Sequence, residues 1–526
     1  MGLAVIPAPL QFDPDGGRYV LRAGARIAYG AGELAPAVRR FCSEIARRTG
    51  LRATAVAGSD GPQEPSLRVE LIDRGELDAV PSPRGASPTG DRPPDERYSL
   101  TLAGDQAVVR AKEPIGVARG LTTFLQLASV APSANATEVS LPGGVILDGP
   151  RYAWRGLSLD VARRFVAPDE VRRVIDLLAL YKLNVLHLHL TDDQSWRLPQ
   201  ARPGAAGLAD DAFYRNEDLS ALVAYATDRF VTLVPEVDTP GHASALVQLR
   251  PELQTARNEA DVELSPGHPH QPVWLDPDLP ATFELIEEVL AGVAAIFPGP
   301  YLHIGGDEPR GMPRDLYRSY VRRVRDVVRS IGKRPIGWQE SARAGLGRED
   351  VIQFWLTDID LAASLPPGRR AQRDADLVAS RRDVETARSA GAPVIVSPLR
   401  RCYLDVPYAG HSADPLQALR QGQAGLRLYS PMTVEESFDW EPADALGPGA
   451  APLVAGVEAA IWSETISNFD DLAFLLLPRL AGVSQRAWSD PQVSSWIAHR
   501  ARLARHGQLW RQDNLTYFRD ATVDWR

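Results

Sequence analysis

The sequence predicts an α/β protein in which a (β/α)8 TIM barrel follows a smaller α+β domain. Three observations predict this class: a length of 526 residues, a change of pattern near residue 150, and the alternation of short apolar runs with longer helical segments after that point. We expect an N-terminal α+β domain over residues 1–148 and a barrel with C-terminal closing helices over residues 149–526. A doubly wound parallel sheet is the alternative for the second part.

Short strands and one long helix are expected in the N-terminal domain. Ser66–Ile72 and Tyr98–Leu102 alternate polar and apolar residues, which is typical of half-buried strands. Glu113–Ser129 has the apolar spacing of an amphipathic helix. Val80–Glu96 is rich in proline, glycine, serine and charged residues, so we expect an exposed loop. A Leu-Asp-Gly-Pro turn at residues 147–150 marks the boundary.

Short apolar runs separated by helical segments predict the barrel strands. In the first connection Pro168 stands where a first-turn proline belongs, and two acidic residues follow it. Leu399–Val454 is a long insertion before the last strand, and closing helices are expected after Asp470. The candidate strands are Arg155–Val161, Val185–Leu190, Thr232–Val237, Tyr301–Gly306, Arg334–Trp338, Val351–Trp355, Pro393–Pro398 and Ala455–Trp462.

Composition and charge exclude several classes of protein. Hydrophobic residues make up 44% and charged residues 24%, which is typical of a globular protein rather than a disordered chain. A net charge of −9 without a basic block argues against nucleic-acid binding, and no run reaches the roughly 18 apolar residues of a membrane span. The start MGLAVIPAPLQF lacks signal-peptide features, so we expect a cytoplasmic protein, with secretion as the alternative if a leader precedes it. Cys42 and Cys402 are expected to stay unpaired.

Acidic and aromatic side chains gather at the predicted strand ends. In a barrel the residues beyond the C-terminal ends of the strands converge on one face, which carries the active site. Aromatic rings pack against sugar C–H surfaces and carboxylates accept hydrogen bonds from sugar hydroxyls, so this mixture indicates a carbohydrate site. The residues at these positions are Arg163, Asp192, Asp193, Asp238, His242, Asp307, Glu308, Trp338, Trp355, Tyr403, Asp405 and Glu464.

The run HIGGDE at residues 303–308 is the sharpest local signal. Two glycines at a strand end let the backbone turn tightly or let a ligand approach closely. The two adjacent carboxylates repel each other, which raises the proton affinity of one of them. A carboxyl group that keeps its proton near neutral pH is what a general acid requires. A glycine turn followed by a solvated acidic pair is the alternative interpretation.

Together with four other motifs, this run resembles the family-20 glycoside hydrolases, the β-N-acetylhexosaminidases. The other motifs are LDVARRF at 159–165, HLHLTDDQSWR at 187–197, VPEVDTPGH at 234–242 and WSET at 462–465. The resemblance covers residues 150 to 490, and the preceding segment is similar to the small α/β domain that commonly precedes the family's barrel. It implies an exo-acting enzyme on amino-sugar glycosides that releases terminal N-acetylglucosamine or N-acetylgalactosamine without a metal or organic cofactor.

The resemblance also implies a substrate-assisted mechanism. The 2-acetamido oxygen of the substrate attacks the anomeric carbon to form an oxazolinium ion, which water opens with retention. Glu308 is implied as the general acid and then the base, and an ionised Asp307 holds the acetamido N–H and stabilises the developing positive charge. Tyr403, in the run SPLRRCYLD, is implied to donate to the acetamido oxygen.

The resemblance also implies roles for three residues around the carboxylate pair. Asp192 and His242 are implied to form a relay behind the acid. Arg163 matches the family arginine that grips sugar O3 and O4, with its neighbour Arg164 as the alternative.

The sugar ring and its acetamido group are implied to be held by the remaining strand-end residues. Asp405 is expected to accept from the O4 or O6 hydroxyl, and Glu464 to bind O4 and O6. Trp338, Trp355 and Trp462 are implied to wall the acetamide pocket.

Three histidines are expected below the site, and one loop departs from the family pattern. His187 and His189 are predicted in the barrel interior, and His303 one layer below the site, within reach of sugar O3. Family members often carry a further aromatic residue between strands seven and eight, where this chain has Leu428 with Tyr429 beside it. We expect the leucine at this position to affect which leaving groups the enzyme prefers.

Two other classes compete with this hypothesis. A metal-dependent amidohydrolase barrel would use His187, His189, His242 and His303 as zinc ligands, but that fold needs its H-x-H motif after the first strand rather than in the second. A lectin-like barrel without activity normally loses the acid or its orienting partner, and both are present here. The natural glycan, a disaccharide-releasing activity and the oligomeric state stay open.

Overall fold

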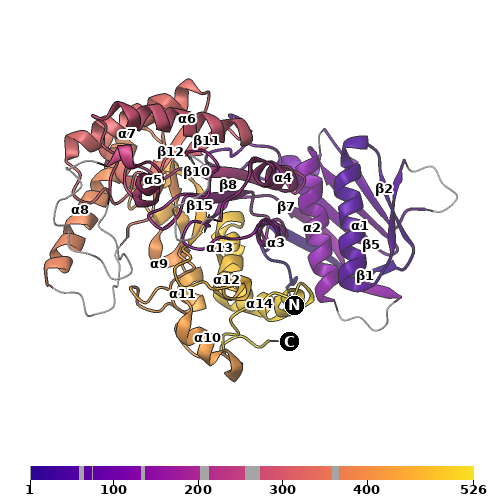
Figure 1. Cartoon of the computed structure of the whole chain (residues 1–526). Helices are drawn as coiled ribbons and strands as arrows, with labels where there is room; N and C mark the ends of the chain where they lie inside the picture. Colours follow the sequence, from indigo (N-terminus) through magenta and orange to yellow (C-terminus); the bar gives the residue numbers. More distant parts are fainter. Residues whose placement is uncertain are drawn as a thin grey trace.

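The computed structural model describes residues 2–58, 64–73, 75–131, 137–201, 212–254, 273–357, 367–493 and 495–525. Figure 1 shows an α+β domain beside a barrel that is surrounded by helices. The barrel is closed, which confirms the predicted fold class and excludes the doubly wound sheet. The boundary after residue 148 stays a prediction, and the last strand of the first domain ends at Asp148.

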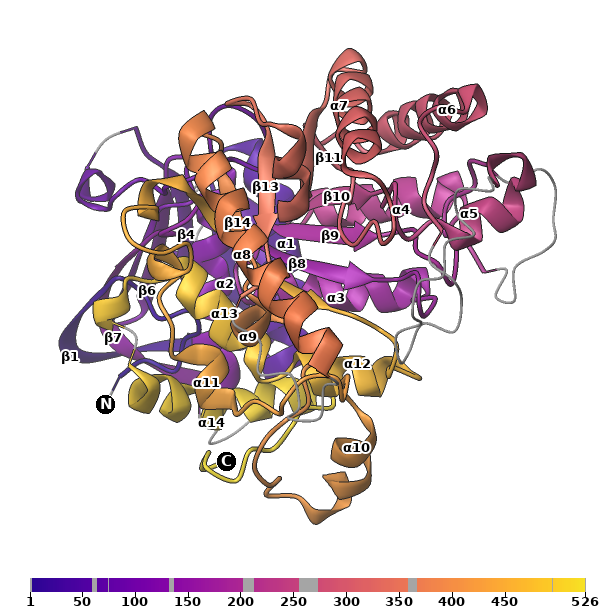
Figure 2. The same ribbon diagram turned by 90° about the vertical axis from the view of Figure 1, so that its left-hand side faces the viewer.

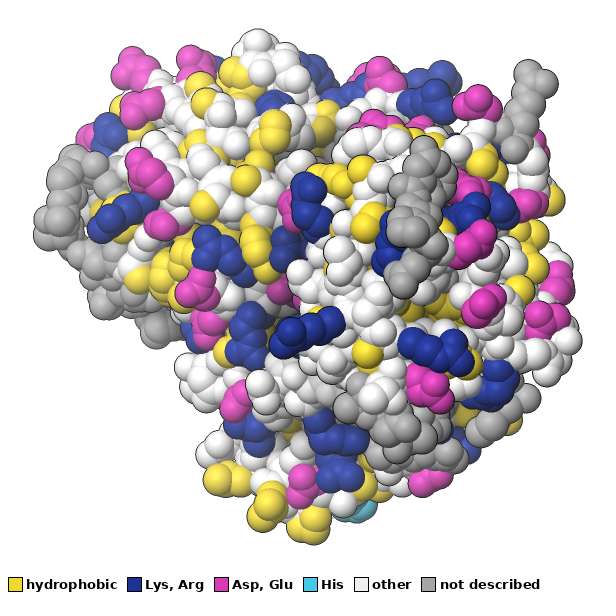
Figure 3. All heavy atoms as spheres, turned by 90° about the vertical axis from the view of Figure 1, so that its right-hand side faces the viewer, with side chains coloured by type: hydrophobic (Ala, Val, Ile, Leu, Met, Phe, Trp, Pro, Cys, Tyr) yellow, Lys and Arg dark blue, Asp and Glu magenta, His cyan; other side chains and the backbone are white. Residues whose placement is uncertain are grey.

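A seven-stranded sheet and two long helices form the N-terminal domain. The strand order is β1-β7-β5-β6-β4-β2-β3, and the strands from β6 to β3 run parallel. The helices lie on the side toward the barrel, and on the opposite side positive and negative side chains are interspersed (Figures 1 and 3). The elements are β1 (Gln11–Arg22), β2 (Ala25–Tyr29), α1 (Ala35–Thr49), β3 (Ala53–Ala57), β4 (Leu67–Leu71), β5 (Tyr98–Ala103), β6 (Gln106–Ala111), α2 (Pro114–Val130) and β7 (Glu138–Asp148).

The helix predicted over Glu113–Ser129 is α2, but the prediction of an amphipathic helix is wrong. Nearly every residue of α2 is buried. The sheet covers one side of the helix, while α1, α3 (Pro168–Leu180) and α14 (Trp496–Gln512) contact the others. A helix between two domains has no solvent face, so a polar stripe is not required.

The prediction of an exposed loop is wrong for part of residues 80–96. The amide of Ala86 donates a 3.0 Å hydrogen bond to the carbonyl of Ala455 at the start of the last barrel strand. Ala86 also packs on the layer of apolar side chains at the N-terminal end of the barrel. The loop therefore covers the mouth of the barrel that lies opposite the strand C-termini.

All eight predicted barrel strands are present and parallel, which confirms the strand prediction. Each contributes one apolar residue to the layer that fills the N-terminal end, such as Trp154, Val185 and Ile336. The strands are β8 (Trp154–Asp160), β9 (Val185–His189), β10 (Thr232–Glu236), β11 (Tyr301–His303), β12 (Arg334–Trp338), β13 (Val351–Phe354), β14 (Val394–Val396) and β15 (Val454–Ile461).

Helices cover the outside of the barrel. α3 begins at Pro168 as predicted, and Glu170 of its first turn accepts a hydrogen bond from the Ala167 amide. The others are α4 (Asn216–Thr227), α5 (Ser244–Leu249), α6 (Pro280–Ile296), α7 (Arg314–Ser330), α8 (Pro367–Ala390), α9 (Leu399–Cys402), α10 (Ala418–Gln423), α11 (Val434–Phe438), α12 (Phe469–Leu476) and α13 (Arg479–Trp488).

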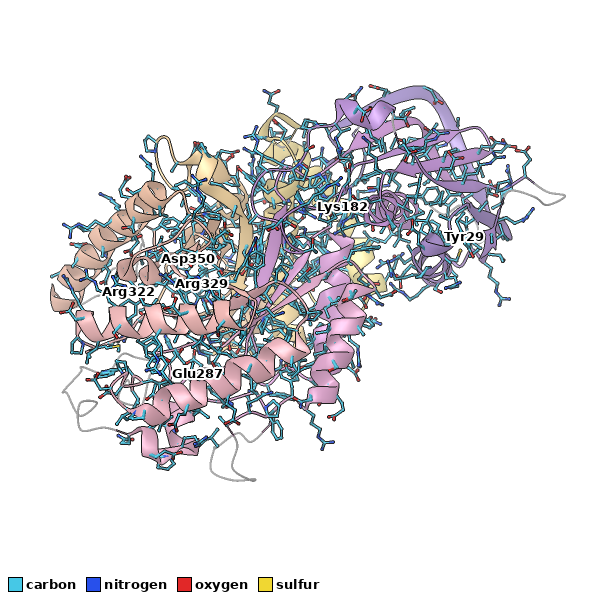
Figure 4. The ribbon with its side chains drawn as sticks, turned by 90° about the horizontal axis from the view of Figure 1, so that it is seen from above. Tyr29, Lys182, Glu287, Arg322, Arg329 and Asp350 are labelled. Atoms are coloured by element: carbon cyan, nitrogen blue, oxygen red, sulfur yellow. The ribbon has the colours of Figure 1, made fainter. Side chains whose placement is uncertain are left out.

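The fifth β–α unit is shorter than the repeat pattern predicts. Between β12 and β13 the chain forms a 3-10 helix, η5 (Gln339–Ala344), in place of an α-helix. Side chains of α7 hold this connection: Arg325 donates to the Ser341 carbonyl, and Arg329 pairs with Asp350, as Figure 4 shows for the latter pair. The arginines of α7 thus make contacts with this connection that an α-helix after β12 would otherwise supply.

The insertion before β15 contains α9, α10 and α11 and projects beneath the barrel (Figures 1 and 2). Cys42 and Cys402 are both buried free thiols, as expected. Within the described part of the chain, none of the helices has the length and hydropathy required to cross a membrane.

Candidate active site

A chain of charged groups crosses the C-terminal ends of β8, β9, β10 and β11. The Arg163 guanidinium lies 2.7 Å from Asp192 Oδ2, and Asp192 Oδ1 lies 3.2 Å from His242 Nδ1. His242 Nε2 lies 3.7 Å from Asp307 Oδ2 and 3.9 Å from Glu308 Oε2. The fold thus brings together five of the predicted site residues.

Both central members of this chain are ionised near neutral pH. Burial by itself lowers the pKa of His242, but Asp192 and Asp238 outweigh it and hold this pKa well above its usual value. Burial likewise raises the pKa of Asp192, but Arg163 and His242 hold it well below its usual value. The relay is therefore an imidazolium paired with a carboxylate.

The structure distinguishes between the two neighbouring arginines. Arg164 Nη2 lies 2.9 Å from Glu170 of α3, and the Arg164 amide donates to Ser463 Oγ. Its side chain therefore points away from the carboxylate pair. Arg163 is the arginine at the site.

The HIGGDE turn depends on its glycines. Gly305 and Gly306 have φ values of +68° and +96°, and a Cβ on Gly305 would lie 1.6 Å from Asp238 Oδ1. Asp238 Oδ1 accepts a 3.1 Å hydrogen bond from the Gly306 amide. The turn therefore packs directly on the end of β10, which sets the position of the two carboxylates that follow.

Asp307 is a largely buried carboxyl group with a raised pKa. Burial raises the pKa of Asp307 to about 6; the charge of His242 opposes this rise and that of Glu308 adds to it. Burial and Asp307 also raise the pKa of the adjacent Asp238 well above its usual value. Among the described residues, no group donates a hydrogen bond to the buried Asp307 Oδ1, which leaves an acceptor for a ligand N–H.

Arg310 contacts the other carboxylate of the pair. Its Nη2 lies 2.9 Å from Glu308 Oε1. A guanidinium at this distance favours the ionised carboxylate, which is the form of Glu308 that serves as a base. Glu308 also has a φ of 41°, an uncommon backbone conformation that is found at functional sites. Sequence reasoning missed Arg310 because it follows the motif in an ordinary loop.

Four aromatic rings form a wall beside the carboxylates. Trp355 stacks on Tyr403 with ring centroids 6.2 Å apart and planes within 12°. Trp462 meets Tyr403 edge-on at 5.9 Å, and Trp338 lies 5.9 Å from Trp462. The strand-end tryptophans and the tyrosine predicted for one pocket therefore form a continuous row of neighbouring rings.

Glu340 of η5 is a buried carboxyl group that sequence reasoning missed. Its Oε2 accepts a 3.2 Å hydrogen bond from Trp355 Nε1. Burial, with the charge of Asp307 adding to it, raises the pKa of Glu340 to about 8. No motif signalled this residue, because an acidic residue after a strand is ordinary on a solvent-exposed turn.

The far side of the site is formed by Asp405, Glu464 and the insertion. Burial, with Glu464 adding to it, raises the pKa of Asp405 to about 8. The phenol of Tyr429 faces the same groups: its pKa is raised well above the usual value by burial, by Asp405 and by Glu308. Leu428 is 39% exposed. Tyr429 is therefore the aromatic residue of this loop that lies near these groups, and the effect of Leu428 on leaving-group preference stays a prediction.

The three barrel histidines are fully buried beneath the site. His189 Nδ1 lies 2.6 Å from Glu236 and its Nε2 lies 2.8 Å from Asp192, so both ring nitrogens are paired with carboxylates. A metal on either ring nitrogen would displace the hydrogen bond made there. The His303 ring has no exposed surface, and its contact with a sugar hydroxyl stays a prediction. His187 lies beside it, with ring centroids 4.6 Å apart.

Comparison with known protein families matches both parts of the chain. The family described as "Glycosyl hydrolase family 20, catalytic domain" matches residues 152–491. The family described as "Glycosyl hydrolase family 20, domain 2" matches residues 2–149.

Characterised relatives are similar over almost the whole length. The β-N-acetylhexosaminidase of Cellulomonas fimi is 32% identical over 99% of this chain and 97% of its own. The solved structure of the GH20 β-N-acetylhexosaminidase from Streptomyces coelicolor A3(2) has a TM-score of 0.80 at 31% identity and covers 99% of both chains. A mutant Streptomyces plicatus β-hexosaminidase, solved in complex with its product GlcNAc, has a TM-score of 0.80 at 31% identity and covers 99% of this chain and 98% of that one.

Proposed function

Because this chain belongs to glycosyl hydrolase family 20, we propose that its site releases terminal non-reducing N-acetylglucosamine or N-acetylgalactosamine by substrate-assisted, retaining catalysis. The chain is a β-N-acetylhexosaminidase, a glycoside hydrolase. One observation supports the mechanism: Asp307 and Glu308 lie beside His242 of the relay, and Asp307 is near enough to Tyr403 of the aromatic wall for its charge to add to the burial that raises the Tyr403 pKa. This arrangement supplies a proton donor on one side and an acetamide site on the other.

In the first step the substrate is its own nucleophile. The acetamido oxygen attacks the anomeric carbon as the glycosidic C–O bond breaks, and Glu308 donates its proton to the departing oxygen. Asp307, ionised above its pKa of about 6, accepts a hydrogen bond from the acetamido N–H and stabilises the positive charge of the oxazolinium ion. The Tyr403 hydroxyl donates to the acetamido oxygen and directs its attack.

In the second step the roles of acid and base reverse. Glu308, now ionised, takes a proton from water as the water oxygen bonds to the anomeric carbon and the oxazolinium C–O bond breaks. Arg310, 2.9 Å from Glu308, stabilises the carboxylate in this state. The His242 imidazolium, held by Asp192, lies on the other side of the same carboxylate. Two displacements at one carbon give overall retention.

Binding of the sugar follows from the groups around this pair. Arg163, Asp405 and Glu464 are the polar groups for the O3, O4 and O6 hydroxyls. Trp338 and Trp462 bound the acetamide pocket with the Trp355–Tyr403 stack. We infer that Tyr429 forms the aglycone wall, because its phenol lies near enough to Glu308 for that charge to add to the burial that raises its pKa.

The test is a matched pair of aryl β-glycosides, one with a 2-acetamido group and one with a 2-hydroxyl. We expect the wild-type protein to cleave only the first, with the β-anomer as the initial product in NMR spectra. Glu308→Gln should lower kcat/KM by about 10³-fold with a poor leaving group and much less with dinitrophenol, because only the poor leaving group needs the proton.

Comparable cleavage of both glycosides would show that an enzyme nucleophile exists, and the proposal would then be wrong. Cleavage of neither, with release of a disaccharide from longer substrates, would point to the disaccharide-releasing alternative.

A further inference from the structure

The Glu236 carboxylate, at the end of β10, makes four close contacts inside the barrel. Its Oε1 accepts a 2.8 Å hydrogen bond from Trp338 Nε1 and lies 2.9 Å from His303 Nδ1. Its Oε2 lies 2.6 Å from His189 Nδ1 and 3.1 Å from His187 Nε2. The side chain is fully buried.

One of these contacts fixes a ring of the acetamide wall. Trp338 is buried, and its indole N–H donates to Glu236. A charge-assisted hydrogen bond is about twice as strong as a neutral one and defines the plane of the ring. The ring then contacts Trp462, which contacts Tyr403. The orientation of the wall is therefore set from below by this carboxylate.

A second contact leads to the acid and base of the site. His189 lies between two carboxylates, Glu236 at 2.6 Å and Asp192 at 2.8 Å. Burial by itself lowers the pKa of His189, but these carboxylates hold it well above its usual value. The imidazolium donates both N–H groups, so it fixes the Asp192 carboxylate. Asp192 in turn holds His242, next to Glu308.

We propose that Glu236 is a positioning residue that couples the acetamide wall to the acid–base relay through a single buried carboxylate. The inference rests on the proposed function, since it assigns Trp338 and His242 to the two halves of one reaction. Substrate-assisted catalysis requires the acetamido oxygen and the general acid to be aligned on opposite faces of the same anomeric carbon. A rigid link between their supports meets this requirement.

The barrel offers a matched control in Glu458 of β15. This carboxylate is equally buried and has the same kinds of partner: His187 Nδ1 at 2.9 Å, Trp154 Nε1 at 2.8 Å and Gln353 Nε2 at 3.0 Å. Its tryptophan belongs to the layer at the opposite end of the barrel. Glu458 shares His187 with Glu236, but its hydrogen bonds go to neither Trp338 nor His189. Glu458→Gln therefore perturbs the same buried network without removing a direct contact to either half of the site.

The experiment compares Glu236→Gln, Glu458→Gln, Trp338→Phe and the double variant Glu236→Gln/Trp338→Phe in the full-length protein. We expect kcat/KM on an aryl 2-acetamido glycoside to fall about 100-fold in Glu236→Gln and to stay within about threefold in Glu458→Gln. Trp338→Phe keeps an aromatic side chain, although a smaller one, and removes the N–H. The double variant should therefore lose less than the product of the two single losses, because the shared hydrogen bond is removed only once.

A spectroscopic readout separates positioning from general destabilisation. The protein has 11 tryptophans, and their indole N–H signals can be followed by nitrogen-15 labelling. The signal that disappears in Trp338→Phe should shift in Glu236→Gln and stay in place in Glu458→Gln. If Glu236→Gln does not fold, Glu236→Asp, which keeps the charge on a shorter stem, is measured in the same assays and should give an intermediate loss.

Equal losses in the two glutamine variants, strictly multiplicative effects in the double variant, or an unmoved Trp338 signal would each overturn the proposal. A wild-type protein that fails to cleave the 2-acetamido glycoside would overturn the proposed function itself, so the two failures are distinguishable.

Discussion

At the scale of single residues, the site contains carboxyl groups whose burial opposes their ionisation. Asp405 is the clearest case: its side chain is buried, and burial raises its pKa to about 8. The backbone amides of Asp405 and Trp462 face it but offset only part of the burial. Such a group contributes to ligand binding at the expense of the stability of the free protein.

Asp405→Asn should therefore stabilise the protein while reducing its activity. In the unfolded chain an aspartate titrates near about 4, whereas Asp405 keeps its proton up to about 8 in the folded state. Between these values unfolding releases a proton, so wild-type stability falls as pH rises from about 4 to about 8. Urea unfolding should show Asp405→Asn to be more stable than wild type by up to about 5 kcal/mol at pH 8 and equal to it near about pH 4.

Asp439→Asn is the control, since this aspartate of the same insertion has a side chain that is 77% exposed. A pH-independent difference between Asp405→Asn and wild type would contradict the argument. Loss of activity in the folded variant would support a role for the carboxylate in binding sugar hydroxyls.

Sequence motifs predicted the site residues that follow the C-terminal ends of the barrel strands. This was possible because these strand ends all lie on one face of a barrel. They left Arg163 and Arg164 as alternatives, since only the Arg164–Glu170 pair shows which arginine turns outward. Glu236 stood within a quoted motif but received no role, because its partners come from three other strands. Spacing along one chain does not reveal such contacts.

At the scale of elements, composition predicted the wrong environment for the loop over residues 80–96. Proline, glycine and charge are typical of solvent-exposed connections. Here the loop closes the N-terminal mouth of the barrel, which exists only once all eight strands have assembled. The same reasoning applies to η5, where repeat periodicity predicts a helix but the arginines of α7 take over part of its packing.

Gly85 provides a test of this closing role. Its φ is +92°, and a Cβ would lie 1.9 Å from the carbonyl oxygen of Ala455. Gly85→Ala should cost about 3 kcal/mol of unfolding free energy, because neither backbone can yield easily. The kcat of the folded fraction should be unchanged, because the loop lies at the end of the barrel opposite the site. Thermal unfolding and kinetics on one preparation measure both quantities.

Gly90→Ala separates the steric clash from backbone strain in the same loop. Gly90 has a φ of +138°, and among the described residues no atom beyond its chain neighbours lies within 4 Å of the position that a Cβ would take. Only the backbone strain of about 1 kcal/mol should therefore remain in this variant. Equal losses of stability in the two alanine variants would show that the contact with the barrel contributes nothing.

At the scale of the whole molecule, buried charges connect the two domains. Lys182, at the barrel side of the junction, lies 3.0 Å from Asp148 Oδ2 and 2.9 Å from the Tyr98 hydroxyl (Figure 4). Asp148 also accepts a 2.9 Å hydrogen bond from Trp488 of α13. Composition and hydropathy predicted two domains but could not predict this contact, because its members lie in four separate segments of the chain.

Because the Lys182–Asp148 contact is buried between the two domains, we expect the domains to unfold together. Lys182→Met removes the cation and leaves Asp148 as a buried unpaired carboxylate, which should cost about 3–5 kcal/mol. Lys182 already has a positive φ of 56°, and methionine inherits that backbone without new branching. The double variant Lys182→Met/Asp148→Asn should recover most of the loss, because it leaves no buried charge without a partner.

Urea unfolding followed by near-UV circular dichroism and by residual activity should give one coincident transition in all three proteins. A first transition that keeps full activity would instead mean that the barrel is stable on its own, and that the Lys182–Asp148 contact holds only the N-terminal domain in place.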